Sequence, residues 1–210
     1  MTDTAPTTRE RLLEAARELF TTTGYHDTTT PILAHRAGVA EGTIYRHFPS
    51  KQALLNAAYQ ETQRWGSGMV REISGGAPRS VGERLGALGR LWLHQAEVNP
   101  ARIRLLLAWR QPRELDELSR AAASDMRTGL EHLIALGKQQ GSVRAGVVEL
   151  WAAVWLALVT FAVEKVANKE WHASHPHALA TLDAAWEAIA WRPITMGAAS
   201  TPAEPATEVR

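Results

Sequence analysis

Cysteine is missing from this 210-residue sequence, which excludes disulfides, thiolate zinc sites and a cysteine nucleophile. An excess of one charge is missing too: 23 lysines and arginines stand against 22 aspartates and glutamates, so bulk charge identifies no partner. The longest uncharged apolar run, residues 150–163, is shorter than the roughly 18 residues that a membrane helix needs. The N-terminus has no export-signal pattern, so we expect a cytoplasmic protein that is not held in a membrane.

Apolar residues at helical spacing run through most of the sequence, and no alternating strand pattern interrupts them. With 45% apolar residues, the chain can bury a substantial core. We therefore predict an all-α fold. In the larger C-terminal part, proline and glycine punctuation predicts helices over residues 80–98, 100–109, 112–140, 146–168 and 176–191.

The N-terminal part carries clear helix start and stop signals. Thr7 and Glu10 have the spacing of a capping box at the start of a first helix, which Gly24 ends. Ser50 can cap a long helix that continues to the glycines at 75–76. We expect the boundary between two domains to lie along this long helix.

Two short helices are predicted between these longer ones. The threonines at 28–30 precede Pro31, which is typical of a helix start, and Gly38 permits a turn into a helix over residues 40–48. Two short helices joined by a glycine-containing turn indicate a helix-turn-helix, whose second helix enters the DNA major groove.

The second short helix has the side chains that such a role requires. Gly42 and Thr43 keep its N-terminal end small, so that the backbone can approach the bases, and Thr43 can also bond a base or a phosphate. Tyr45 and His47 can reach phosphates. Arg46 can bind guanine with two hydrogen bonds, or a phosphate.

Three neighbouring residues complete this hypothesis. Ile44 and Phe48 should point inward and hold the helix against the first one. Lys51 lies in the first turn of the next helix, where its charge and the free backbone N–H groups favour a phosphate.

Residues 9–55 resemble the DNA-binding domain of the tetracycline-repressor (TetR) family of bacterial transcription regulators. The matching stretches are residues 12–20, 24–25, 28–29, 33–34, 37–39, 42–48 and 50–51. The resemblance implies DNA contacts, mostly to phosphates, by Thr29, Thr43, Tyr45, His47 and Lys51. Thr30-Pro31 departs from the family's pattern, which leaves the start of the second helix open between Thr29 and Thr30. The predicted DNA-binding set is Thr29, Thr30, Gly42, Thr43, Tyr45, Arg46, His47 and Lys51.

The same resemblance implies a helical C-terminal domain that forms a homodimer and holds a small-molecule pocket. We expect a DNA-binding domain over residues 1–52, an effector-binding and dimerisation domain over 53–196, and a disordered tail over 197–210. The helix over 146–168 is apolar nearly all round, and the last helix has a seam with 3–4 spacing, which independently favours dimerisation. The predicted interface residues are Trp151, Leu158, Leu179, Leu182, Trp186 and Ile189.

Eight tryptophans, all outside the DNA-binding segment, suit either a hydrophobic pocket or a packed core and interface. The residues predicted to line an effector pocket are Trp65, Met69, Trp92, Trp109, Met126, Trp155 and Phe161. His172, His175 and His177 have spacing that could bind a metal, but they surround a proline loop without a nearby carboxylate. We expect exposed loop histidines and no metal or cofactor.

No nucleophile–base pairing, paired-carboxylate motif or phosphate loop is present, so we predict no catalytic residues and no enzyme. The hypothesis is a repressor that is released from a near-palindromic operator by a small, largely hydrophobic effector. Two alternatives remain open: a helical-bundle enzyme or metal-binding protein, and a protein-interaction module that has the fold without DNA binding.

Overall fold

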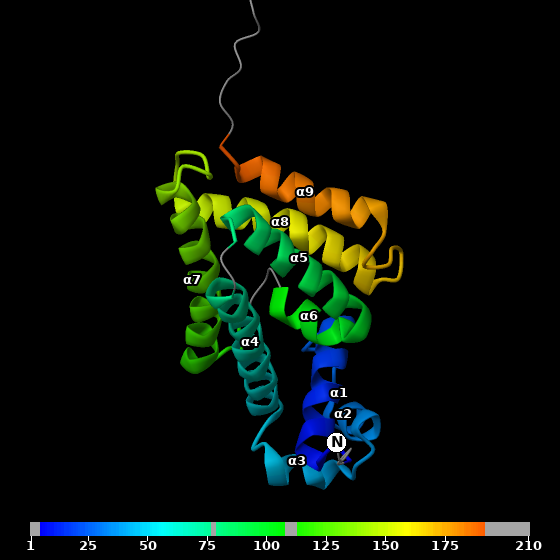
Figure 1. Cartoon of the computed structure of the whole chain (residues 1–210). Coiled ribbons are helices and arrows are strands. Elements are labelled where there is room, and N and C mark those ends of the chain that lie inside the picture. The colour runs from blue at the N-terminus through cyan, green and yellow to red at the C-terminus, as the bar shows by residue number, and fades with distance from the viewer. Residues whose placement is uncertain (1–4, 77–78, 108–112, 192–210) are drawn as a thin grey trace, which may run out of the picture.

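The computed structural model describes residues 5–76, 79–107 and 113–191 (Figure 1). These residues form nine helices and no β-sheet, which confirms the all-α prediction. The helices are α1 Thr8–Thr22, α2 Thr30–Ala37, α3 Glu41–His47, α4 Lys51–Gly75, α5 Val81–Val98, α6 Pro100–Leu107, α7 Glu117–Gln139, α8 Val148–Ala167 and α9 Pro176–Ile189.

The N-terminal helices start and stop where the sequence signals predict. Thr7 and Glu10 form the reciprocal capping box at the start of α1. Gly38 ends α2 with φ of 65°, a left-handed conformation that favours glycine and turns the chain into α3. Ser50 caps α4 by accepting a hydrogen bond from the Ala53 N–H at 3.0 Å.

The long helix α4 runs from the N-terminal helices toward the C-terminal ones (Figure 1) and contributes side chains to two hydrophobic cores. Its first half, from Leu54 to Tyr59, packs into a core with α1, α2 and α3. Met69 and Val70 in its second half belong to a larger core built with α5 to α9. A movement of α4 therefore affects both cores, because one rigid helix contributes side chains to each.

Helix α8 is long and apolar enough to cross a membrane, judged by its length and composition alone. In this structure one face of α8 packs against α5 and α9, with Trp155, Val159 and Ala162 buried. Leu150 and Phe161 remain exposed on its other face. The core therefore accounts for one face of α8 and leaves the other face uncovered.

One helix begins later than its sequence pattern predicts. The predicted span 112–140 starts too early, because residues 113–116 are not helical and α7 begins at Glu117. Asp116 caps α7 by accepting a hydrogen bond from the Ser119 N–H at 2.7 Å, while Leu115 is buried in the N-terminal core. The predicted tail, 197–210, lies outside the described residues.

Candidate nucleic-acid interface

Helix α3 has one face packed against the protein and one face in solvent. Ile44 and Phe48 are buried in the N-terminal core, as predicted. Tyr45 is 52% exposed, and Arg46 and His47 are exposed beside it. The outer face thus carries three side chains that can donate hydrogen bonds to phosphates or base edges.

The N-terminal end of α3 is open to an approaching surface. Gly42 is exposed, and a Cβ at this position would meet no atom within 4 Å. Its φ is not in the left-handed region, so neither packing nor backbone strain inside the chain requires glycine here. Thr43 follows it, half-buried, and its N–H donates to the Ala40 carbonyl at 2.9 Å. A partner that approaches the backbone closely gives a physical reason for glycine at this position.

Thr29 and Thr30 occupy different positions at the start of α2. Thr29 is the exposed N-cap residue, and its side chain makes no capping hydrogen bond. Thr30 is the first helical residue, and its hydroxyl donates to Glu41 Oε1 at 3.0 Å. The start that the sequence left open is therefore Thr30, whose side chain ties α2 to α3 while that of Thr29 remains available.

Lys51 is engaged inside the protein. Its Nζ donates to the carbonyl oxygens of Tyr25 and Thr28, each at 2.8 Å, and lies 4.3 Å from the centre of the Tyr25 ring. The side chain therefore holds the loop between α1 and α2 against the start of α4. The sequence could not reveal this contact, because the two carbonyls belong to residues more than 20 positions earlier in the chain.

Replacing Lys51 with methionine is expected to lower the free energy of unfolding by about 1–3 kcal/mol, because two charge-assisted hydrogen bonds are lost. Chemical denaturation measures this effect, and Arg46→Met is the matched control that removes one exposed charge from α3. If Lys51→Met leaves stability unchanged and instead reduces the salt slope of DNA binding by about one, Lys51 is a phosphate contact after all.

A polar junction joins the N-terminal half of α4 to the start of α7. Asn56 is buried, and its Oδ1 accepts hydrogen bonds from the Asp116 N–H at 2.8 Å and the Ser119 hydroxyl at 2.6 Å. Its Nδ2 donates to the Glu114 carbonyl at 3.1 Å. Sequence reasoning missed Asn56, although a polar residue between Leu55 and Ala57 in an apolar stretch was a possible signal.

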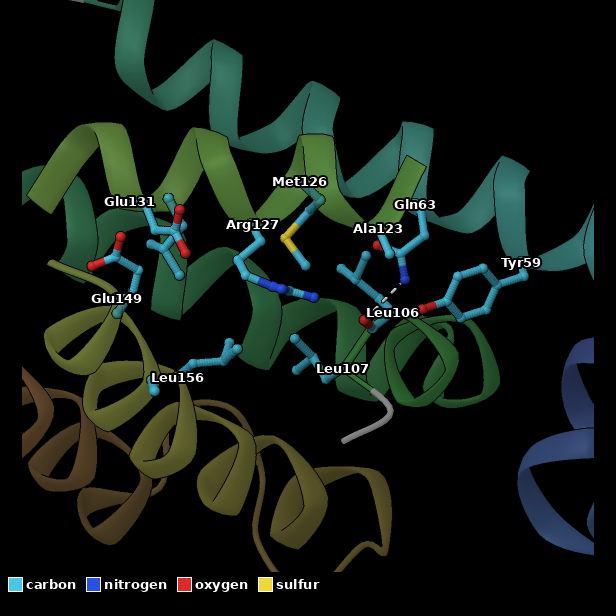
Figure 2. Close-up of a pocket in the computed structure, with 13 residues that line it drawn as sticks. Tyr59, Gln63, Leu106, Leu107, Ala123, Met126, Arg127, Glu131, Glu149 and Leu156 are labelled. Carbon is cyan, nitrogen blue, oxygen red and sulfur yellow. Dashed lines mark hydrogen bonds between the residues drawn. The ribbon is translucent and has the colours of Figure 1, made fainter. Parts of the chain in front are cut away.

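A cavity of about 400 Å³ lies between α4, α6, α7 and α8 (Figure 2). Its volume is within the range of small-molecule sites. The lining residues are Tyr59, Gln63, Leu106, Leu107, Ala123, Met126, Arg127, Leu130, Glu131, Glu149, Ala152, Ala153 and Leu156. Met126 is the member of the predicted pocket set that lines this cavity.

The structure places the other residues of that set elsewhere. Trp92 and Trp155 are fully buried and pack against each other, with ring centroids 5.7 Å apart, and Met69 is buried in the same core. Trp65 packs under the Arg102 guanidinium, 4.5 Å from its ring centre. Phe161 is exposed on α8. Trp109 lies outside the described residues.

The predicted dimer residues divide into buried and accessible positions. Leu182 and Ile189 are buried in the chain's own core, so they are out of reach of a second chain. Leu182 lies so close to α5 that a Cβ at Gly89 would come within 2.8 Å of it, which explains the glycine. The positions that remain at least partly exposed are Trp151, Leu158, Leu179 and Trp186.

The three histidines before and at the start of α9 form a ring cluster. The prediction of exposed loop histidines is only partly correct, because His175 is half-buried at the N-cap and His177 lies in the first turn of α9. His175 stacks on Trp171, with centroids 5.6 Å apart, and its Nδ1 accepts a hydrogen bond from the His177 N–H at 3.2 Å. Desolvation and the neighbouring imidazoles lower the pKa of His175. The described residues include no group of three or more histidines and carboxylates arranged to hold a metal.

Sequence comparison identifies relatives of this chain. Residues 12–58 match the profile described as "Bacterial regulatory proteins, tetR family". The transcriptional regulator UidR of Escherichia coli is 37% identical over 68 residues, which is 32% of this chain and 35% of UidR. The match thus spans about a third of UidR. The nucleoid occlusion factor SlmA of Marinobacter nauticus is 33% identical over 147 residues, covering 70% of this chain and 74% of SlmA.

Solved structures share this fold over most of the chain. The regulator FadR of Bacillus subtilis, solved in complex with stearoyl-CoA, aligns over 84% of this chain and 95% of its own, with a TM-score of 0.65 and 23% identity. The profile match covers α2, α3 and parts of α1 and α4, and the SlmA match covers more than two thirds of this chain. This chain is therefore a member of the TetR family of bacterial transcription regulators.

Proposed function

We propose that this chain is a homodimeric repressor that binds double-stranded operator DNA through α2 and α3 and is released by a small-molecule effector. The observation that carries this proposal is the outer face of α3. Tyr45 and Arg46 are exposed there and make no hydrogen bond or ion pair with any described residue. Polar side chains that nothing inside the chain uses are suited to an external polyanion.

The proposed DNA contacts differ in role. Thr29, Thr43, Tyr45 and His47 hydrogen-bond phosphates, and Arg46 reads a base edge or binds a phosphate. Thr30 and Lys51 were both predicted contacts, but in the protein without DNA their polar atoms bond Glu41 and the loop carbonyls. We propose that these two residues position α3 rather than contact DNA. Gly42 allows the backbone to come close.

The chain divides functionally along α4. The proposed domains are residues 1–52 for DNA binding and 53–196 for effector binding and dimerisation, followed by the tail at 197–210. The first turns of α4 also pack into the N-terminal core. The family consists of transcription regulators, so we propose no enzymatic role, and a DNA-binding repressor acts in the cytoplasm.

The accessible face of α8 and α9 supports the proposed dimer. Leu150, Phe161 and Leu179 are large apolar side chains exposed on these two helices, a pattern that marks interaction surfaces. Two copies that pair through this face form a four-helix interface. A two-fold dimer presents two α3 helices, and a separation of about 34–36 Å fits successive major grooves.

The dimer is tested by introducing a charge into this face. Leu158→Arg is expected to halve the mass measured by light scattering, because a buried arginine without a partner opposes association. Leu118→Arg is the matched control, since Leu118 is 70% exposed on α7 and away from the proposed interface. An unchanged dimer mass for Leu158→Arg, with the same result for Leu150→Arg, contradicts this interface.

Effector release is proposed to act through the cavity and the Asn56 junction. The cavity touches α4 and α7, and Asn56 bonds α4 to the start of α7. A ligand that binds one arrangement of α4 and α7 better than another shifts the population toward that arrangement, to an extent set by the difference in affinity. The shift changes the distance between the two α3 helices of the dimer. The relative FadR was solved with stearoyl-CoA, which supports effector binding in a fold of this kind.

The proposed function is tested by selecting DNA from a random library with the purified protein. We expect enrichment of one inverted repeat whose half-sites lie one helical turn apart or a multiple of it. Enrichment of a sequence without two-fold symmetry contradicts operator binding by a symmetric dimer. Absence of any enriched sequence favours the alternative of a protein-interaction module that does not bind DNA.

A further inference from the structure

The inner wall of the cavity holds a buried amide with an unused oxygen. Gln63 on α4 is only 1% exposed, and its Nε2 donates to the Leu106 carbonyl at 3.3 Å (Figure 2). A carbonyl only accepts hydrogen bonds, so this contact fixes the orientation of the amide. Oε1 is therefore the free end, and it has no donor among the described residues. An acceptor left unsatisfied in this way is a cost that a ligand donor can remove.

A potential donor lies beside this acceptor. Tyr59 is buried one turn earlier on α4, and its side chain reaches the Gln63 amide (Figure 2). Burial raises the pKa of the Tyr59 hydroxyl, so it keeps its proton at neutral pH. The inner end of the cavity thus offers one hydrogen-bond acceptor and one donor side by side.

The remaining inner walls are apolar. They are formed mainly by Leu106, Leu107, Met126, Leu130 and Leu156. Such walls favour a ligand whose body is hydrocarbon. A single polar group on that body can then reach Tyr59 and Gln63 at the inner end.

Charged residues lie toward the other end of the cavity. Glu131 and Glu149 are together there, and Arg127 lies between them and the inner end (Figure 2). None of the three forms an ion pair with a described residue. Two carboxylates and one guanidinium give this lining a net negative charge, so an anionic ligand gains no net attraction from it.

We propose that the effector is an uncharged, mostly apolar alcohol or phenol whose hydroxyl is buried between Gln63 and Tyr59. This inference rests on the function proposed above and adds the ligand class. The ligand hydroxyl donates to Gln63 Oε1 and accepts from the Tyr59 hydroxyl, so both protein groups are satisfied at once. A hydrocarbon leaves Gln63 Oε1 without a donor, and an ether cannot donate to it.

The test compares three probes that share one apolar body: 1-naphthol, 1-methoxynaphthalene and 1-naphthoate. Calorimetric titration of the full-length protein is expected to show naphthol binding about tenfold tighter than methoxynaphthalene, because only naphthol has the donor. Naphthoate should bind more weakly than naphthol. Naphthol should also release the selected operator at lower concentration than methoxynaphthalene does.

Variants assign the preference to its residue. Gln63→Met keeps the length of the side chain and removes the acceptor, so naphthol and methoxynaphthalene should bind within about twofold of each other. Gln60→Met is the matched control: this glutamine is on the same helix but donates to Ser119 Oγ at 3.2 Å, outside the cavity lining. It should retain the tenfold preference. Circular dichroism checks that both variants fold. If Gln63→Met does not fold, the proposal is still tested by the preference of the wild-type protein for naphthol over methoxynaphthalene.

Four outcomes overturn the ligand class. The first is equal affinity of the wild-type protein for naphthol and methoxynaphthalene, and the second is an undiminished preference for naphthol in folded Gln63→Met. The third is binding of naphthoate that is tighter than that of naphthol and is abolished by Arg127→Gln. The fourth is no binding of any probe at about 1 mM. Operator binding without probes is measured on the same preparation. If it persists while the hydroxyl preference fails, only the ligand class is wrong; if it is absent, the proposed function fails independently.

Discussion

Removing the hydroxyl of Tyr45 is expected to weaken operator binding on the order of 100-fold or more. A hydrogen bond to a charged group contributes about 1.5–3 kcal/mol, and a Tyr45→Phe dimer loses two of them. The free energy of unfolding should not change, because Tyr45 is 52% exposed and its hydroxyl bonds no described residue.

Fluorescence anisotropy with the selected operator measures this loss. Ser124→Ala is the control, since it removes an exposed hydroxyl from α7, far from α3 along the chain. A loss of less than about twofold for Tyr45→Phe shows that the side chain does not bond a phosphate, and the proposed docking of α3 must then be revised.

The second large effect is on stability. Trp92→Ala is expected to lower the free energy of unfolding by about 3–5 kcal/mol, as large-to-small changes in packed cores do. Trp92 is fully buried and packs against Trp155 at a centroid distance of 5.7 Å. Its Nε1 has no hydrogen-bond partner among the described residues, so the indole contributes through packing rather than through a polar contact.

Trp92→Phe is the informative companion variant. It keeps an aromatic ring and removes the unpartnered N–H, so the loss should be smaller than about 2 kcal/mol. Urea denaturation measures the free energy of unfolding of both variants, which shows whether Trp92 contributes to core packing. A loss below about 1 kcal/mol in Trp92→Ala, accompanied by loss of effector affinity, supports the predicted pocket role of Trp92 instead.

The helix-turn-helix was predictable because its signals are local. The Thr7–Glu10 capping box and the turn at Gly38 depend on residues within a few positions of each other. Helical periodicity was also sufficient to predict that Ile44 and Phe48 point inward. Local spacing determines these features, so one sequence can reveal them.

The cavity and the role of Lys51 depend on contacts between distant segments. Aromatic residues suit both pockets and cores, and only the fold shows that Trp92 meets Trp155. The residues at the inner end of the cavity, Tyr59 and Gln63, come from a helix whose periodicity says nothing about the facing α6 and α7. Lys51 likewise bonds carbonyls whose position only the folded loop defines.

In the last helix, α9, the spacing of apolar residues did not determine which of them face the chain's own core. Its 3–4 spacing correctly indicated a packing seam, but spacing does not say whether the seam faces the same chain or a partner. Leu182 and Ile189 face the chain's own core, whereas Leu179 is exposed. The distinction depends on α5, where Gly89 allows α9 to approach closely.

The most direct test of the regulator is a titration of the selected inverted repeat at several salt concentrations. We expect saturation at two chains per duplex and much weaker binding to a single half-site. The logarithm of the affinity should fall linearly with the logarithm of the salt concentration. Equal affinity for the inverted repeat and for scrambled DNA of the same length would contradict sequence-specific operator binding by a dimer.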